Sequence, residues 1–308
     1  MIGAVRWLWC FALCACNQVF GLEHTELLDG GGAGEDTDGD GVEDLVDNCP
    51  AIANSTQLDV DQDMIGDACD PCSFGFDPAL DRDKDTVNAA VDNCPGAADP
   101  GQTDSDGDTV GDICDPRPSS ADTLRCFADF WINVPRAWPI ADPWKWLGTA
   151  SSAIIIHSPA SAQPFWLGAE ASGLPPAHGA VQVQMQVPGS PTTNVEVAKG
   201  IAIGADDGSA FAACELIRSF TSSGISLRVS ESSGVLDEVN VSFTPTHVTL
   251  VYRDVPNGID LQCIASDTTG MRVLALGATD HPVTRSKVFL TATNEGGQFY
   301  SLAIYDTP

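Results

Sequence analysis

Four short runs of aspartate place carboxylates where a single cation could gather them. In each run acids occupy loop positions 1, 3, 5 and 12, and an aliphatic residue at position 7 could add its backbone carbonyl. The carboxylate sets are Asp36/Asp38/Asp40/Asp47, Asp59/Asp61/Asp63/Asp70, Asp81/Asp83/Asp85/Asp92 and Asp104/Asp106/Asp108/Asp115, and the carbonyls belong to Val42, Ile65, Val87 and Val110. Several hard oxygen donors without a soft donor are typical of calcium sites. Position 12 is Asp and not the Glu of an EF-hand, and no helical pattern flanks the runs, so we expect several calcium ions on another scaffold.

The runs come in pairs that repeat every 45 residues, which is typical of a structural array. Asp36 is followed by Asp81 at this interval, and Asp59 by Asp104. Two pairs of cysteines keep the same phase. They predict the disulfides Cys49–Cys69 and Cys94–Cys114.

Residues 36–115 are too acidic and too poor in large apolar side chains to fold around a core of their own. They hold 21 Asp and one Glu against one Arg and one Lys, and 14 of the 80 residues are Leu, Ile, Val or Phe. Such a composition is typical of disordered chains. Calcium that neutralises the acids and disulfides that close the loops could replace the core. A solvated acidic linker is the alternative for a single run, but four runs in one register favour calcium.

The sequences DTDGDGVEDLVDNCP and DVDQDMIGDACD, followed by DNCP and DSDGDTVGDICD, resemble the thrombospondin type 3 repeat. The resemblance implies that residues 35–118 wind around a line of calcium ions with almost no hydrophobic core. Loop position 6, normally a Gly with positive φ, is Gly41 in the first loop but Met64, Thr86 and Thr109 in the others, which predicts backbone strain there. Ala89 stands where the first copy has Asp44, so we expect the third loop to be the weakest site.

The first 34 residues predict export. Residues 1–16 read as a signal peptide, because a short apolar run follows one Arg. Leu13-Cys14-Ala15-Cys16 resembles a lipobox, which implies lipidation of Cys16 and a place on a bacterial outer membrane or cell surface. An ordinary signal peptide and a secreted protein are the alternative. Residues 17–34 contain a Gly triplet and predict a flexible tether.

Residues 119–308 predict a β-sandwich, so the chain as a whole is expected to be mostly β. The segment 181–187 alternates between apolar and polar residues. Ten further short strands, separated by Gly, Pro, Asn and Asp, are predicted at 153–157, 200–204, 211–217, 225–230, 238–244, 247–253, 260–266, 272–276, 287–293 and 299–305. The order of features is similar to a concanavalin-like or laminin-G-like jelly roll. Two further disulfides are predicted. Cys214–Cys263 would join neighbouring strands, and Cys72–Cys126 would tie the repeats to the sandwich.

No motif in residues 119–308 indicates catalysis. The chain has no closely spaced acid pair on one strand, as retaining glycoside hydrolysis requires, and no G-x-S-x-G elbow. The net charge of −29 argues against nucleic acid as a partner. The leading interpretation is a calcium-binding adhesion or binding protein outside the cell, whose stiffened repeats present the sandwich to a protein or glycan ligand. It would touch a membrane only through its lipid anchor. A lectin is the alternative, with five Trp residues between positions 131 and 166 either stacking on sugars or packing in the core; a secreted glycoside hydrolase is the third.

Overall fold

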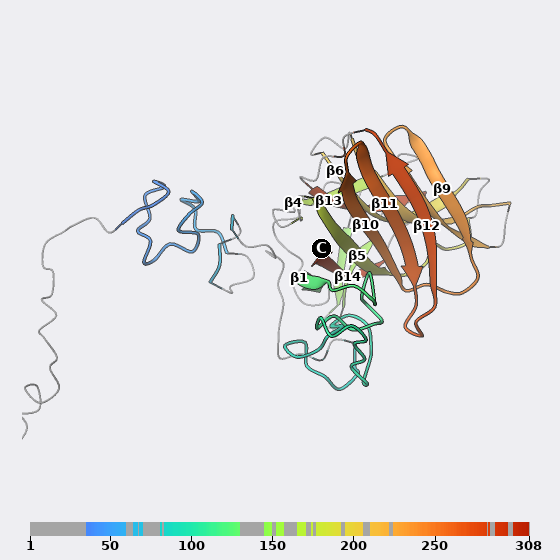
Figure 1. Cartoon of the computed structure of the whole chain (residues 1–308), viewed down its shortest axis with the longest axis horizontal. Helices are drawn as coiled ribbons and strands as arrows, with labels where there is room; N and C mark the ends of the chain where they lie inside the picture. Colours follow the sequence, from blue (N-terminus) through green and yellow to red (C-terminus); the bar gives the residue numbers. More distant parts are fainter. Residues whose placement is uncertain are drawn as a thin grey trace, which may run out of the picture.

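A computed structural model shows a β-sandwich with a compact region of loops packed against it (Figure 1). It describes residues 35–59, 64–66, 68–69, 81, 83–129, 145–149, 152–156, 165–170, 174, 177–191, 195–205, 210–221, 224–281, 283, 287–294 and 298–307. All the regular elements in these residues are β-strands, which confirms the predicted fold class. None of the residues in these ranges forms a helix that could span a membrane. The predicted signal peptide, Cys16 and the tether lie outside the described residues.

The first sheet has six antiparallel strands in the order β1-β14-β5-β10-β11-β12. Its strands are β1 (Thr123–Asp129), β14 (Phe299–Asp306), β5 (His178–Met185), β10 (His247–Val255), β11 (Gly258–Ser266) and β12 (Arg272–Thr279). In β5 the apolar side chains of Val181 and Val183 point into the core, and the intervening Gln182 points to the outer face. The predicted alternation therefore sets the orientation of this strand.

The second sheet also has six antiparallel strands, in the order β4-β13-β6-β7-β8-β9. Its strands are β4 (Phe165–Glu170), β13 (Lys287–Thr293), β6 (Val197–Gly204), β7 (Ala212–Arg218), β8 (Ile225–Glu231) and β9 (Gly234–Val241). A separate hairpin joins β2 (Lys145–Thr149) to β3 (Ser152–Ile156). The side chains of the five Trp residues between positions 131 and 166 lie outside the described part of the structure.

The core lies between the two sheets and is crossed by a disulfide. Aliphatic residues of both inner faces pack together, among them Ile201, Leu227 and Leu250. Cys214 of β7 is bonded to Cys263 of β11. The predicted pair is present, and the two strands that it joins face each other across the core from different sheets. The bond therefore fixes the two layers to each other.

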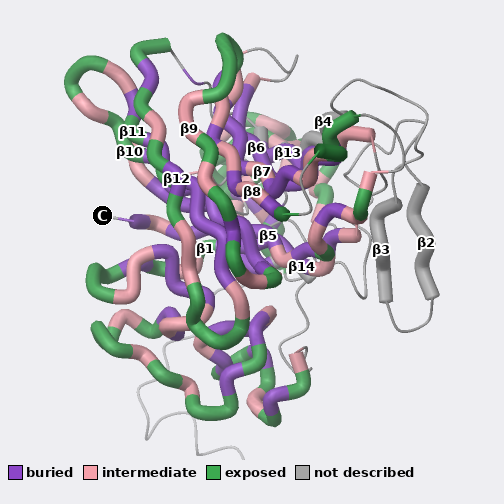
Figure 2. The backbone as a smooth tube through the Cα atoms, turned by 90° about the vertical axis from the view of Figure 1, so that its right-hand side faces the viewer, coloured by how far each residue is buried: buried purple, intermediate pink, exposed green. Residues whose placement is uncertain are grey.

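The second half of the repeat region packs on the outer face of the first sheet (Figure 2). Cys94, Ala97 and Val110 form one apolar cluster with strand residues that include Phe127 and Tyr305. We call this contact the seam. The expectation of almost no hydrophobic core in residues 35–118 is therefore wrong for this half, which buries apolar side chains by sharing them with the sandwich.

Polar groups of the sandwich also reach across the seam. The Gln182 amide donates from Nε2 to the carbonyl of Cys114 at 2.9 Å, and Arg272 donates from Nη2 to the carbonyl of Asp112 at 2.6 Å. Buried hydrogen bonds of this kind are costly to break, because each would leave an unpaired polar group. They fix the register of the repeats on the sheet.

We expect acid to weaken the seam, because His247 of β10 lies there beside Cys94, Gly96 and Gln182. The side chain is 2% exposed, and burial lowers its pKa to about 4, against an ordinary value of 6.5. The neutral form is therefore favoured in the folded chain, and stability is present above pH 6.5 and lost as the pH falls towards 4. In saturating calcium, we expect the free energy of unfolding to fall by about 3 kcal/mol more over this range in the wild type than in His247→Gln. Chemical denaturation at a series of pH values measures this difference, and parallel curves for the two proteins would contradict it.

Candidate metal centre

The first aspartate of each loop holds the turn in shape. Asp36 accepts hydrogen bonds from the backbone amides of Gly39 at 2.8 Å and Gly41 at 3.1 Å. Asp104 does the same for Gly107 at 2.7 Å and Thr109 at 3.0 Å. These bonds curl the backbone so that acids at alternate positions turn towards one another. The first and fourth loops thus have the same geometry, as the repeat period predicts.

Position 6 has positive φ in every loop. The φ angles are 96° at Gly41, 79° at Met64, 82° at Thr86 and 81° at Thr109. Three of these residues carry a Cβ, so their backbone conformation is unfavourable in isolation. The predicted strain is present. The loops keep it because the position-6 amides of all four donate to the first aspartate.

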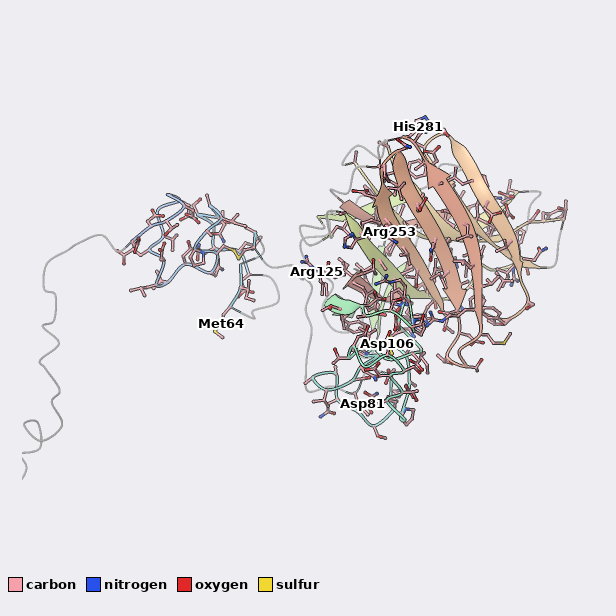
Figure 3. The ribbon with its side chains drawn as sticks, viewed as in Figure 1. Met64, Asp81, Asp106, Arg125, Arg253 and His281 are labelled. Atoms are coloured by element: carbon pink, nitrogen blue, oxygen red, sulfur yellow. A yellow bond between two sulfur atoms is a disulfide. The ribbon has the colours of Figure 1, made fainter. Side chains whose placement is uncertain are left out.

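Three of the four predicted carboxylate sets converge. Within each set, one carboxylate oxygen from each acid lies within 4.8 Å of those of the other two, and the sets are Asp36/Asp38/Asp40, Asp81/Asp83/Asp85 and Asp104/Asp106/Asp108. Figure 3 shows Asp81 and Asp106 in the region below the sandwich. In the second loop Asp59 and Ile65 are described, whereas Asp61, Asp63 and Asp70 lie outside the described residues. The position-7 residues Val42, Val87 and Val110 follow directly on these turns, with their amides bonded to the position-5 acids.

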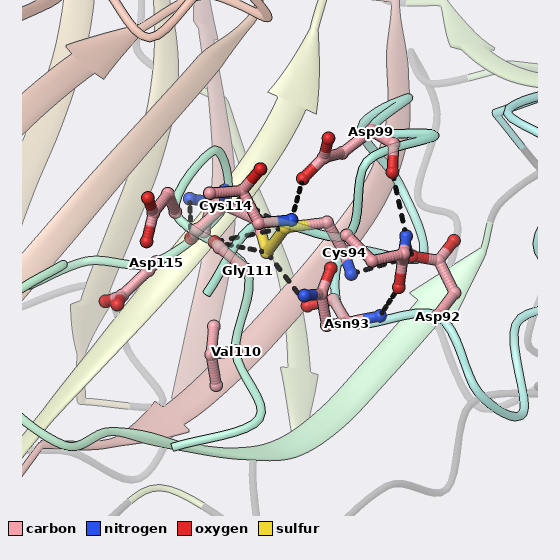
Figure 4. Close-up of a disulfide and its surroundings, with 12 residues drawn as sticks. Asp92, Asn93, Cys94, Asp99, Val110, Gly111, Cys114 and Asp115 are labelled. Atoms are coloured by element: carbon pink, nitrogen blue, oxygen red, sulfur yellow. Dashed lines mark hydrogen bonds between the residues drawn. A yellow bond between two sulfur atoms is a disulfide. The ribbon is translucent and has the colours of Figure 1, made fainter. Parts of the chain in front are cut away.

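The position-12 acids carry the strongest sign of a cation. Asp47, Asp92 and Asp115 are 9%, 8% and 1% exposed. In each, Oδ1 accepts a backbone amide two residues further on, at 2.8 Å, 2.8 Å and 2.5 Å. Oδ2 of each is buried with no hydrogen-bond partner among the described residues. Figure 4 shows Asp92 and Asp115 beside the Cys94–Cys114 disulfide. A buried carboxylate oxygen without a donor is costly unless a cation binds it.

The acids at position 3 complete the group of converging carboxylates in each loop, which we call the cradle. Oδ2 of Asp38 and of Asp83 is likewise buried, without a partner in the described part of the chain. Burial, together with the charges of Asp92 and Asp85, raises the pKa of Asp83 to about 7. Burial and the nearby Asp122 raise the pKa of Asp115 to about 8. Carboxylates pushed together in this way repel, and a divalent cation is the group that reverses the repulsion. The donor set, which is all oxygen, fits calcium.

The sequence analysis missed a ligand candidate that lies 14 residues after the position-5 acid in the first, third and fourth loops. The backbone amides of Asn54 and Asp99 donate to Oδ2 of Asp40 and Asp85 at 2.6 Å and 3.0 Å, and the amide of Asp122 donates to Asp108. Asp122 is 2% exposed, and its Oδ2 is also without a partner among the described residues. The 45-residue repeat could have identified these positions, because Asn54 and Asp99 are 45 residues apart, as are Asp77 and Asp122.

Asp44 and Asp112 brace the loops. Asp44 accepts hydrogen bonds from the amide and the hydroxyl of Thr37 at 2.8 Å and 2.7 Å. Asp112 accepts from the same two groups of Ser105 at 2.8 Å and 2.6 Å. Ala89 cannot accept such hydrogen bonds, so the third loop lacks this cross-link. The buried oxygens of Asp83 and Asp92 that have no hydrogen-bond partner among the described residues are still present there.

Disulfides connect successive loops. The bonds Cys49–Cys69 and Cys94–Cys114 form as the sequence predicts. They bring the chain so close that a Cβ at Gly66 or Gly111 would lie 2.2 Å or 2.4 Å from the side-chain oxygen of Asn48 or Asn93. Glycine is therefore required at both positions. Cys126 is also disulfide-bonded, and Cys72, its predicted partner, lies outside the described residues.

Asp122 provides a test of the cradle beyond the predicted repeats. We expect Asp122→Asn to weaken calcium binding at one site by about tenfold, because it removes one charge from the group around Asp115. Without calcium the same change should relieve repulsion by Asp108 but weaken the ion pair of Asp122 with Arg117, so we expect it to cost little stability. Calcium titration by calorimetry measures the first effect and chemical denaturation in EDTA the second. Asp306→Asn is the control, since Asp306 pairs with Arg125 at the surface; equal calcium binding by both variants would contradict the assignment.

Comparison with known proteins assigns the N-terminal region. A family model described as the thrombospondin type 3 repeat matches residues 34–57, 58–102 and 103–116. A comparison with curated protein sequences finds no match.

Three solved structures illustrate what the chain is similar to in fold. A protein of unknown function, SO2946 from Shewanella oneidensis MR-1, is 10% identical with a TM-score of 0.39, over 61% of this chain and 87% of that chain. The Emp46p carbohydrate recognition domain, in its metal-free form, is 10% identical with a TM-score of 0.37, over 58% of this chain and 98% of that chain. A lectin from Bauhinia forficata in complex with GalNAc is 10% identical with a TM-score of 0.35, over 61% of this chain and 99% of that chain. We draw no conclusion about a ligand from these similarities. Residues 34–116 thus match the thrombospondin type 3 repeat, and they precede a two-sheet β-sandwich.

Proposed function

We propose that this protein binds several calcium ions outside the cell and uses them to hold its β-sandwich in a fixed setting for ligand binding. One observation carries the proposal: Asp47, Asp92 and Asp115 each bury a carboxylate oxygen that has no hydrogen-bond partner among the described residues. These oxygens lie in the three loops whose other acids already converge. Calcium at these positions would supply the missing partner, and millimolar extracellular calcium matches the affinity of such modules.

The seam makes calcium binding a property of the sandwich as well. The fourth loop contributes Val110 and Cys114 to the apolar cluster that also contains Tyr305 of β14. Asp115, at the end of the same loop, directly follows Cys114 in sequence. An ion held by Asp115 therefore stabilises the backbone against which the first sheet packs. Binding free energy passes to the sandwich through this shared packing.

Export is consistent with the cysteine chemistry. Three disulfides are described in the structure, and disulfides persist in oxidising compartments. We propose that the chain is carried to the cell surface by lipidation of Cys16, with secretion as the alternative. On the surface the sandwich would act in adhesion or ligand binding and not in catalysis. A lectin is the more specific version of this function; a glycoside hydrolase would require turnover of a polysaccharide.

Calcium removal tests the proposal on the purified full chain. Each site that is saturated at about 100 times its Kd contributes about 2.7 kcal/mol. Two sites at the seam should therefore raise the Tm of the sandwich by at least about 10 °C over the value in EDTA. Differential scanning calorimetry measures the shift, and isothermal titration gives the number of ions. Magnesium at the same concentration is the control, because it demands a tighter octahedral geometry. A sandwich Tm that is the same in calcium and in EDTA would refute the coupling between calcium binding and sandwich stability.

A further inference from the structure

A hollow of about 440 Å³ opens at the seam, with walls from both the third calcium loop and the outer face of the first sheet. Asp83 and Lys84 line it on the repeat side, and Phe127, Gln184 and Tyr300 line it on the sandwich side. The volume is within the usual range of small-molecule sites. Because each module supplies only part of the lining, the hollow exists only when the repeats are docked.

The sandwich side offers an aromatic ring next to neutral hydrogen-bonding groups. Tyr300 of β14 is half-buried and lines the hollow, whereas Phe127 of the adjacent strand β1 is 8% exposed and lies at its base. The Gln184 amide of β5 and the Ser301 hydroxyl of β14 lie beside them. Gly96 lets the repeat backbone approach this surface, since a Cβ there would lie 3.0 Å from both the Phe127 ring and Ser301 Oγ.

The repeat side adds a charged edge that calcium would order. Asp83 belongs to the convergent carboxylate set of the third loop. Lys84 occupies loop position 4 with a φ of 67°, where the first and fourth loops have Gly39 and Gly107. A lysine in the left-handed region is strained, and such strain is often kept where a side chain has a function. Here the lysine is exposed and belongs to the lining of the hollow.

We propose that this hollow, which we call the seam pocket, binds a pyranose ring of a neutral saccharide. The Tyr300 ring suits an apolar face of a sugar, while the Gln184 amide, the Ser301 hydroxyl and the Lys84 ammonium group suit its hydroxyl edge. Asp83 and Lys84 carry opposite charges, so the lining favours an uncharged ligand over a strongly anionic one. The inference rests on the proposed function, because calcium in the third loop would fix the Asp83 side of the pocket.

Binding to a printed array of neutral hexose and N-acetylhexosamine oligosaccharides tests the proposal with the full chain. Bound sugars are then titrated in solution at about 1 mM calcium. We expect the affinity to fall at least about tenfold in Tyr300→Ala and in Gln184→Leu, and to be lost in EDTA. Phe220→Ala is the matched aromatic control, since Phe220 is exposed away from the seam pocket, and it should bind as the wild type does.

Two calcium-loop variants separate this inference from the proposed function. Asp83→Asn and Asp36→Asn each remove one acid from a convergent set, but only Asp83 lines the pocket. Both should reduce calcium binding, and only Asp83→Asn should reduce sugar affinity. A chain that binds calcium but no sugar on the array would overturn the inference alone, whereas a chain that binds no calcium would overturn the proposed function. Sugar binding that survives both Tyr300→Ala and Gln184→Leu, or occupancy of the seam pocket by a peptide, would also overturn the inference. The Tm of each variant shows that it is folded.

Discussion

Buried carboxylate oxygens that lack a donor are the constraint on which the rest of this molecule depends. A chain with a net charge of −29 concentrates its acids in loops that turn them inward, which is the least favourable arrangement for uncompensated charge. The backbone satisfies one oxygen of Asp92 through the amide of Cys94 and leaves the other for a different partner. Because the raised pKa values of Asp83 and Asp115 have burial as their first cause, the loops oppose their own ionisation. A bound cation removes this opposition, so metal binding and loop structure form one equilibrium.

The same buried carboxylates also affect the sandwich, because the loops that hold them pack on it at the seam. Residues 83–118 do not form a separate rod, because their apolar side chains pack on the outer face of the first sheet. Val110 is buried there, while Ile65, the corresponding residue of the second loop, is exposed. The same repeat pattern thus occurs in two environments. The position-7 side chain faces solvent in the second loop and packs on the sandwich in the fourth. A region whose own apolar residues give it only marginal stability is thus stabilised by packing against a larger domain.

The sequence predicts the local features of this structure well and the long-range ones poorly. Aspartate spacing and cysteine phase identify the loops and two disulfides, because both patterns are set within a few residues of each other. Alternation locates β5, and the turn residues around it locate most of the sandwich strands. By contrast, β1, β2 and β4 are missed. In β1, Arg125 interrupts the apolar pattern at a register shift in the pairing with β14. The strand β9 runs from Gly234 to Val241, whereas the sequence suggested Glu238 to Thr244.

The candidate site shows the same division between local and distant signals. The acids at positions 1, 3 and 5 converge as their spacing implies, but Asp122 belongs to the fourth cradle from beyond the predicted boundary. It lies 14 residues from Asp108, a distance at which a loop gives no periodic signal except by comparison between copies. The seam leaves even less trace in the sequence, since it pairs Gln182 with the backbone of Cys114 across 68 residues. Contacts of that kind follow from the packed fold and not from a local pattern.

A crystal structure of the protein crystallised with calcium tests most directly the central claim that cations bind the buried carboxylate oxygens. The account predicts an ion in each of the first, third and fourth loops, bound by the Oδ2 atoms of Asp47, Asp92 and Asp115 at about 2.3–2.6 Å. Asp122 should reach the ion of the fourth loop. Carboxylates that turn out to solvent, or that bond to each other around no cation, would contradict it.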